Sequence, residues 1–421
     1  MRVCPFSLTP QTPVDAHFSP TLPVYVMAKP AGALCNLRCD YCYYLEKRHL
    51  YRERQKTMMP GDVLETYIRD YIALHAEGTQ VEFVWHGGEP LLQPLSFFMN
   101  VLRLQNKYAG GRQIVNALQT NGTLITPELA HFFHEHNFLI GLSIDGPQEL
   151  HDRYRRSRSG RGSWQQVMKG IGLLNRYGVE WNAMAVVNDA TAADPLGFYH
   201  FFKEIGCRYI QFTPVVERLL PHADGRSLAS PIEYGQAELA PFSVTPEAWG
   251  EFLCTLFDEW VVSDVGEYFV QIFDATLAGW MGMLPPVCSM ARTCGHATAL
   301  EHNGDLYVCD HYVFPEFKLG NIMERPLAEL TRQQSLKDFG ANKERLLTRQ
   351  CHECEYLFAC HGECPRNRFA LSADGEPGHN YLCAGYRRFF KHAAPYMDFM
   401  KRKLMHGEAP ADVMEWARKR G

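Results

Sequence analysis

The eight residues CNLRCDYC (Cys35–Cys42) place three cysteines in one short stretch, with the spacing C-x3-C-x2-C. A structural zinc site closes with four ligands, whereas three thiolates on a cubane iron–sulfur cluster leave one iron free to bind another molecule. The spacing therefore favours an open cluster. A zinc site completed by His49 or by a distant residue is the alternative interpretation.

The triad follows the apolar run PVYVMAK, which is the first of six expected strands. The other five runs begin at Val81, Ile114, Phe138, Val179 and Tyr209. Amphipathic stretches of helical length separate them, at residues 61–77, 95–108, 127–136, 163–177 and 195–205. Repeated β-then-α units form a parallel sheet, and this many of them curl towards a barrel. We therefore predict an α/β fold with a partial (β/α)6 TIM-like barrel.

Polar segments follow these expected strands: GGEP at residues 87–90, QTNG at 119–122 and SIDG at 143–146. In parallel barrels the functional groups gather at the carboxyl ends of the strands. We expect these segments and the cysteine triad to form one site.

Eight further cysteines lie in the second half of the chain, which is enough for two full sets of four. They are Cys288, Cys294, Cys309, Cys351, Cys354, Cys360, Cys364 and Cys383. Four-cysteine sets suit two iron–sulfur clusters or two zinc ions. Cys4, Cys207 and Cys254 fall outside every set and are interpreted as ordinary thiols.

The bulk composition excludes several classes of protein. The 421 residues carry a formal charge of −5 with no basic half, so no binding to nucleic acid or to an anionic membrane is expected. No apolar run approaches the ~18 residues of a membrane helix, and no signal peptide is visible. We predict a cytoplasmic protein, in which 14 cysteines indicate metal or redox ligands more readily than disulfides. The basic run RYRRSRSGRGSW (Arg153–Trp164) is interpreted as a solvated loop, except for Arg155.

Composition and spacing divide the chain into five parts. We expect an irregular arm (1–22), the partial barrel (23–240), a helical connector (241–285), a cysteine-rich domain (286–390) and a C-terminal helix (391–421).

The cysteine triad with an aromatic before its last cysteine, followed by GGEP on the next strand end, resembles the radical S-adenosylmethionine (SAM) superfamily. The resemblance implies a [4Fe-4S] cluster on Cys35, Cys39 and Cys42, with SAM bound at the open iron and consumed as a cosubstrate. It further implies that the SAM amino group, ribose and carboxylate are held by Gly87, Gly88, Glu89, Ser143 and Arg155. For Glu89, a carboxylate that caps the next helix is the alternative.

The later cysteines, in the order C-x9-G-x4-C, then C-x2-C-x5-C-x3-C, then a last cysteine, resemble the SPASM domain, which carries auxiliary iron–sulfur clusters. The resemblance implies two fully ligated [4Fe-4S] clusters, and hence three clusters in the chain. The first would take Cys288, Cys294, Cys309 and Cys364, and the second Cys351, Cys354, Cys360 and Cys383.

Blocks along nearly the whole chain, such as AKPAGALCNLRCDYCYYLEK and CDHYVFPEFKLGNI, resemble the anaerobic sulfatase-maturating enzymes. Members oxidise a cysteine or serine in a C/S-x-P-x-R segment of a sulfatase to Cα-formylglycine. The resemblance implies that Asp310 is the catalytic base, with Tyr44 near the substrate. We expect Asp310 to have a raised proton affinity because it lies away from bulk water. His86 is expected to pack rather than to bind.

Only 34 residues precede Cys35, which leaves no room for a leader-recognition domain, so we expect an enzyme that reads a short internal motif. The expected partners are an extended sulfatase segment in the barrel mouth and a one-electron reductant such as flavodoxin or ferredoxin, acting on a monomer. Two rival interpretations stay open: another SPASM enzyme that crosslinks peptides, and a non-catalytic zinc or electron-carrier protein.

Overall fold

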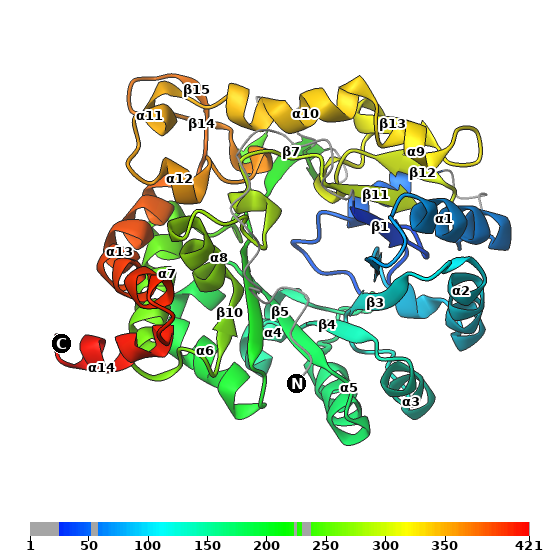
Figure 1. Ribbon diagram of the computed structural model, residues 1–421, viewed down its shortest axis with the longest axis horizontal. Helices are drawn as coiled ribbons and strands as arrows, with labels where there is room; N and C mark the ends of the chain where they lie inside the picture. Colours follow the sequence, from blue (N-terminus) through cyan, green and yellow to red (C-terminus); the bar gives the residue numbers. More distant parts are fainter. Residues whose placement is uncertain (1–24, 52–57, 223–224, 230–236, 421) are drawn as a thin grey trace.

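A ten-stranded sheet forms the centre of the computed structural model, which describes residues 25–51, 58–222, 225–229 and 237–420 (Figure 1). Its strand order is β10-β6-β5-β4-β3-β2-β1-β11-β12-β13. The strands β1 to β6 are parallel and stand in chain order, as a barrel requires. The strands of this sheet are β1 (Tyr25–Lys29), β2 (Gln80–Trp85), β3 (Gln113–Thr120), β4 (Leu139–Ser143), β5 (Trp181–Val187), β6 (Tyr209–Pro214), β10 (Phe269–Val270), β11 (Ala297–Glu301), β12 (Asp305–Tyr307) and β13 (Lys318–Asn321).

Helices cover the outer face of the parallel strands, as Figure 1 shows for α2, α3 and α5. Their ends follow local chemistry: the Thr126 side chain caps the start of α3, and Gly178, with φ +67°, ends α5 in the left-handed conformation. The helices are α1 (Gly61–Ala73), α2 (Leu95–Tyr108), α3 (Pro127–Glu135), α4 (Gln148–Tyr154), α5 (Trp164–Tyr177), α6 (Pro195–Glu204), α7 (Pro246–Ser263), α8 (Gln271–Trp280), α9 (Leu327–Leu330), α10 (Gln334–Arg345), α11 (Arg349–His352), α12 (Leu357–Cys360), α13 (Cys383–Met405) and α14 (Val413–Arg418).

The predicted α/β partial barrel is confirmed, and each of the six expected strands coincides with one of β1 to β6. The expected N-terminal arm, residues 1–22, lies outside the described residues. The cysteine-rich part is joined to the barrel because β11 pairs with β1 in parallel, with Glu301 opposite Lys29. The short strand β10, inside the expected connector, also joins the sheet beside β6.

Two small sheets lie outside the barrel. One contains β7 (Arg218–His222), β8 (Gly225–Leu228) and β9 (Glu238–Leu239), and the other is the hairpin of β14 (Ala370–Leu371) and β15 (Pro377–His379). Helix α13 begins at Cys383, before the boundary expected at residue 391, so the last cysteine of the chain lies in its first turn. Among the helices of the described ranges, none has both the length and the apolar composition that crossing a bilayer requires.

Candidate active site

The cysteine triad lies on an irregular segment that follows β1, with turns before Cys35 and between Cys39 and Cys42. Leu37, Cys39 and Tyr41 are buried while Arg38 and Asp40 face solvent, so alternate side chains point into the protein. Burial, followed by Glu89 and the Cys42 thiolate, raises the pKa of the Cys35 thiol to about 11. Burial raises the pKa of Cys39 further, with Cys42 and Cys35 adding to the effect. Thiols that resist ionisation together fit a cationic cluster, which would stabilise them as thiolates.

His49, the alternative fourth ligand, does not join the triad. Its imidazole is exposed and its Nε2 lies 3.4 Å from a carboxylate oxygen of Glu46. In the described part of the chain, no three histidine, cysteine or acidic side chains converge on one point as a single metal ion requires. A cubane, by contrast, takes each thiolate on a separate iron.

The glycines of GGEP pack directly against the cysteine segment. The Gly88 amide donates to the Gly32 carbonyl at 2.8 Å and the Glu89 amide donates to the Leu34 carbonyl at 2.7 Å. A Cβ on Gly88 would overlap the Leu34 carbonyl oxygen, and Gly87 has φ +130°. The amides of Gly88 and Glu89 are both used in these hydrogen bonds, so the GGEP segment (residues 87–90) has carbonyl groups left to offer a ligand. Carbonyl oxygens accept hydrogen bonds and therefore suit an ammonium group.

The Glu89 carboxylate, just after β2, forms hydrogen bonds to the end of β3. It is fully buried and accepts hydrogen bonds from the Leu91 amide at 2.9 Å, the Thr120 hydroxyl at 2.8 Å and the Asn121 amide at 2.8 Å. Burial raises the pKa of Glu89 to about 7, and this effect outweighs the three hydrogen bonds, which lower the pKa. The Glu89 side chain thus caps the start of the short helix that follows it, and the role of Glu89 in holding SAM stays a prediction.

Arg155 lies beside the cysteine segment, buried against Tyr41 and Asp145. Its Nη1 donates to the Tyr41 hydroxyl at 3.0 Å and lies 3.7 Å from an Asp145 carboxylate oxygen, while Tyr41 donates to Asp145. Its Nε is buried and has no hydrogen-bond partner among the described residues. This free donor fits the carboxylate that the sequence assigned to Arg155. Ser143 ends β4 nearby and is partly exposed.

Electrostatic contacts among the eight later cysteines fall within the two sets that the resemblance to the SPASM domain implies. In the first set, burial raises the pKa of Cys309, and the nearby thiols of Cys288 and Cys364 raise it further. Burial also raises the pKa of Cys364, with a contribution from Cys294. In the other set, burial raises the pKa of Cys360 to about 12, with contributions from Cys383 and Cys351. Cys383 in turn interacts with Cys354. The donor sets therefore fit two clusters with four cysteines each.

Two cations that the spacing did not reveal, buried Lys343 and half-buried Arg368, support the loops of the first of these sets. The Lys343 ammonium donates to the carbonyls of Cys288 at 2.9 Å and Ser289 at 2.7 Å. The Arg368 guanidinium donates to the carbonyls of Lys343 and Gly362 at 2.5 and 2.9 Å. By binding backbone carbonyls of the cysteine loops, these two cations hold the loops in place.

Asp310 lies at the centre of a buried network that joins both parts of the chain. One carboxylate oxygen forms an ion pair with Lys29 at the end of β1, and the other accepts a hydrogen bond from the Tyr43 hydroxyl. The Lys29 ammonium also lies 2.9 Å from His86 Nδ1. His86, expected only to pack, is thus part of the network around Asp310.

The expectation of a raised proton affinity at Asp310 is wrong. Burial raises its pKa, but the Lys29 ammonium, with smaller effects from His86 and His311, lowers it well below the usual value. Burial also lowers the pKa of His86 and of His311 to about 3, so both rings are neutral at pH 7. Lys29 is therefore the cation that keeps Asp310 ionised, and the sequence did not show that they would meet.

The two adjacent tyrosines of YCYYLEK point to different partners. The Tyr44 hydroxyl is buried and donates to Glu301 on β11, while the Tyr43 hydroxyl donates to Asp310. Tyr43, which the sequence did not single out, is thus the tyrosine that contacts Asp310. The place of Tyr44 near the substrate stays a prediction.

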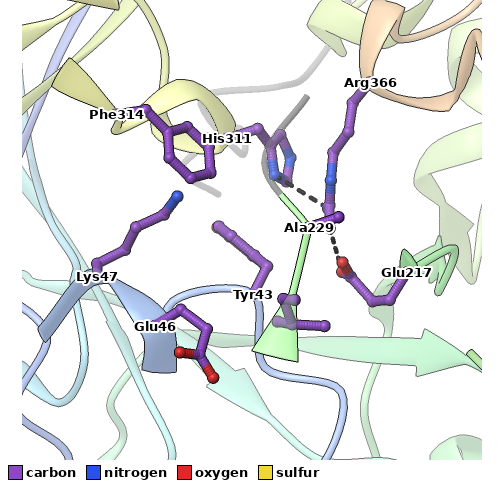
Figure 2. A pocket seen from close by; sticks show the side chains of 9 residues that line it. Tyr43, Glu46, Lys47, Glu217, Ala229, His311, Phe314 and Arg366 are labelled. Carbon is purple, nitrogen blue, oxygen red and sulfur yellow. Dashed lines mark hydrogen bonds and ion pairs between the residues drawn. The ribbon is translucent and has the colours of Figure 1, made fainter. Parts of the chain in front are cut away.

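A polar pocket adjoins this network, as Figure 2 shows. Arg366 lines this pocket and forms an ion pair with Glu217, and its Nη1 lies 3.2 Å from His311 Nδ1. Its guanidinium also lies over the Tyr43 ring. Lys47 points into the pocket with its ammonium 3.0 Å from the centre of the Phe314 ring. Both halves of the chain therefore line the space beside Tyr43 and Asp310.

Comparison with known proteins agrees with this geometry. Residues 31–202 match the radical SAM superfamily, and residues 288–355 match the iron–sulfur cluster-binding SPASM domain. A serine-type anaerobic sulfatase-maturating enzyme of Bacteroides thetaiotaomicron is 58% identical over 93% of this chain and 95% of its own length. The chain belongs to the anaerobic sulfatase-maturating enzymes.

More distant relatives in this family also match over about nine-tenths of the chain, at lower sequence identity. A cysteine-type anaerobic sulfatase-maturating enzyme of Clostridium novyi is 32% identical over 90% of this chain and 98% of its own length. The structure described as native anSMEcpe with bound AdoMet and Cp18Cys peptide superposes with a TM-score of 0.78 at 30% identity, over 90% of this chain and 99% of that one.

Membership in the sulfatase-maturating family replaces the rival interpretation of a non-catalytic zinc or electron-carrier protein. Cys207 and Cys254 are buried away from the cysteine sets, in agreement with ordinary thiols, and Cys4 lies outside the described residues. The roles of individual site residues remain predictions.

Proposed function

We propose that this protein oxidises a serine within an S-x-P-x-R segment of a sulfatase to Cα-formylglycine, using SAM and three [4Fe-4S] clusters. The observation that carries the proposal is Asp310 in contact with Lys29 and Tyr43, where the barrel and the cysteine-rich part meet. The choice of serine is supported by the higher identity to the serine-type relative, 58% against 32% for the cysteine-type one.

Four groups of the chain are proposed to hold SAM beside Cys35, Cys39 and Cys42. The carbonyls of Gly87 and Gly88 accept from its ammonium group, Arg155 Nε donates to its carboxylate, and Ser143 contacts its ribose. Bound there, SAM supplies on one-electron reduction the 5′-deoxyadenosyl radical, which removes one β-hydrogen from the target side chain.

Asp310 is proposed to take the proton that must leave the serine hydroxyl. Conversion of CH2OH to CHO removes two hydrogens: one leaves as an atom to deoxyadenosine, and the other leaves as a proton together with one electron, which an auxiliary cluster would accept. Once that electron departs, the hydroxyl is strongly acidic, so a carboxylate of low pKa is a sufficient base. Because Lys29 keeps Asp310 ionised, the base is ready in every turnover.

The pocket in Figure 2 is proposed to receive the polar part of the sulfatase segment. Its lining includes Lys47, whose pKa is lowered to about 7 by burial, the Arg366–Glu217 ion pair and the Glu46 carboxylate, and these polar groups can bind backbone and side-chain groups of an extended peptide. We further propose that a small electron-carrier protein acts as the reductant and that the enzyme works as a monomer.

The substrate class can be tested by mass spectrometry after anaerobic reconstitution. Peptides with S-x-P-x-R, C-x-P-x-R and A-x-P-x-R are incubated with enzyme, SAM and dithionite. We expect the serine peptide to lose two hydrogens and the alanine peptide to stay unchanged. Conversion of the cysteine peptide alone would contradict the serine assignment. Deoxyadenosine without any change in the peptides would favour the crosslinking SPASM enzymes instead.

The two tyrosines provide a matched pair of variants. Tyr43→Phe removes a hydrogen bond to ionised Asp310, so formylglycine formed per deoxyadenosine should fall roughly tenfold. Tyr44→Phe leaves buried Glu301 without one donor, which should lower the free energy of unfolding by about 1–3 kcal/mol while the product ratio stays unchanged. Product ratios from chromatography and melting temperatures distinguish the two effects. The reverse pattern would assign Tyr44 to the reaction.

A further inference from the structure

The basic run between α4 and α5 forms a small exposed hairpin that the reaction described above does not use. Arg156 pairs with Gly162 across it, the Gly160 amide donates to the Ser157 carbonyl at 2.9 Å, and Gly160 takes φ +79°. Its side chains Arg156, Arg158 and Arg161 are all exposed. The hairpin therefore projects cations into solvent from a rigid base.

This hairpin lies against the outer side of the cysteine segment. The Arg38 amide donates to the Arg156 carbonyl at 2.7 Å, the Asp40 amide donates to the Tyr154 carbonyl at 3.1 Å, and Leu37 bridges to Ser157. Arg38 is exposed between buried Leu37 and buried Cys39. A single layer of chain thus separates the cysteine triad from this surface.

Most of the cationic charge here is not neutralised within the protein. Arg153 is paired with Asp189 at 3.3 Å, and Asp152 is turned inward to accept from the Ser163 and Trp164 amides. The remaining arginines form no ion pair among the described residues, and Asp40 is the exposed acid beside them. We call these four the hairpin patch: Arg38, Arg156, Arg158 and Arg161. The patch is positive on a chain whose net charge is −5.

We propose that the hairpin patch is the docking surface for an acidic electron-carrier protein that reduces the cluster of the cysteine triad. Opposite charges speed encounter and fix orientation, and this surface brings a carrier closest to the loop that holds the cluster. In each encounter the carrier loses one electron and the cluster gains it, without transfer of any atom. The proposal rests on the proposed function, which requires a reduced cluster.

The test compares the variant R156E/R158E/R161E with the control R332E/K337E/K391E, which reverses three exposed cations on the cysteine-rich side. Two measurements are made on reconstituted enzyme: binding of purified flavodoxin by anaerobic calorimetry, and deoxyadenosine formation driven by reduced flavodoxin or by dithionite. We expect the hairpin variant to bind flavodoxin about tenfold or more weakly, and to lose a similar factor in the flavodoxin-driven rate at low flavodoxin. The dithionite-driven rate should stay within about twofold, because that small reductant needs no docking surface. Affinity of the native enzyme should fall with added salt.

Unchanged flavodoxin affinity in the hairpin variant, or equal losses in the control variant, would overturn the proposal. A variant that loses binding to a DNA duplex or to anionic vesicles but keeps its flavodoxin affinity would also overturn it, in favour of those partners. Failure of the proposed function gives a different result from failure of the docking proposal. In that case the native enzyme would leave the serine peptide unchanged even when dithionite is the reductant.

Discussion

Asp310→Asn is expected to form deoxyadenosine within a few-fold of the native rate while losing roughly a hundredfold or more of the formylglycine product. Hydrogen abstraction precedes proton removal, so the amide leaves the first step in place and takes away the acceptor for the second. The measurement is the ratio of product to deoxyadenosine, both quantified by mass spectrometry in the same reaction.

The controls for this variant follow from the network around Asp310. Loss of the carboxylate leaves the Lys29 ammonium buried and unpaired, which destabilises the fold. The double variant K29M/D310N removes that charge as well and should recover melting temperature without recovering product. Asp374→Asn, on the exposed β14–β15 hairpin, should behave like the native enzyme. An unchanged product ratio in Asp310→Asn would remove Asp310 from the reaction.

Gly88→Ala is expected to prevent binding of the first cluster and with it all deoxyadenosine formation. A methyl group at this position would overlap the Leu34 carbonyl oxygen and lie 2.8 Å from the Ala33 carbonyl carbon. These are backbone atoms of the cysteine segment, so the segment itself must move, at a cost above the ~1–3 kcal/mol of ordinary overpacking. Iron content and SAM cleavage measure the loss.

Gly172→Ala is the matched control, since it adds the same methyl group in α5. No atom lies within 4 Å of the position that its Cβ would take. Alanine is the better helix former, so this variant should be about 0.5–1 kcal/mol more stable and fully active. Normal iron binding in Gly88→Ala would show that the GGEP segment does not set the position of the cysteine segment.

The barrel strands could be predicted because each is a short apolar run followed by glycine or polar residues, as at β2 and β4. Helix α8 lies within the helical connector expected over residues 241–285, whereas the two-residue strand β10 was missed because it is too short to show any period. Tertiary packing decides such segments.

The site was predictable where spacing carries the information and not where distant side chains meet. The spacing gave enough cysteines for two sets of four, the family resemblance divided them, and the contacts among the thiols fall within those sets. Tyr43 and Asp310 are 267 residues apart, and a lysine at a strand end gives no sign that it will face Asp310. The proton affinity of Asp310 was therefore misjudged, because burial was foreseen and the neighbouring ammonium was not.

The pairing of β1 with β11 constrains how this chain can fold during synthesis. One edge of β1 finds β2 soon after it is made, but its other edge must wait for residues 297–301. At ribosomal speeds that interval lasts on the order of ten seconds to a minute. An open strand edge is a template for pairing with other chains. Newly made protein is thus most exposed to aggregation before its cysteine-rich half emerges, and expression should benefit from chaperones that shield the first strand.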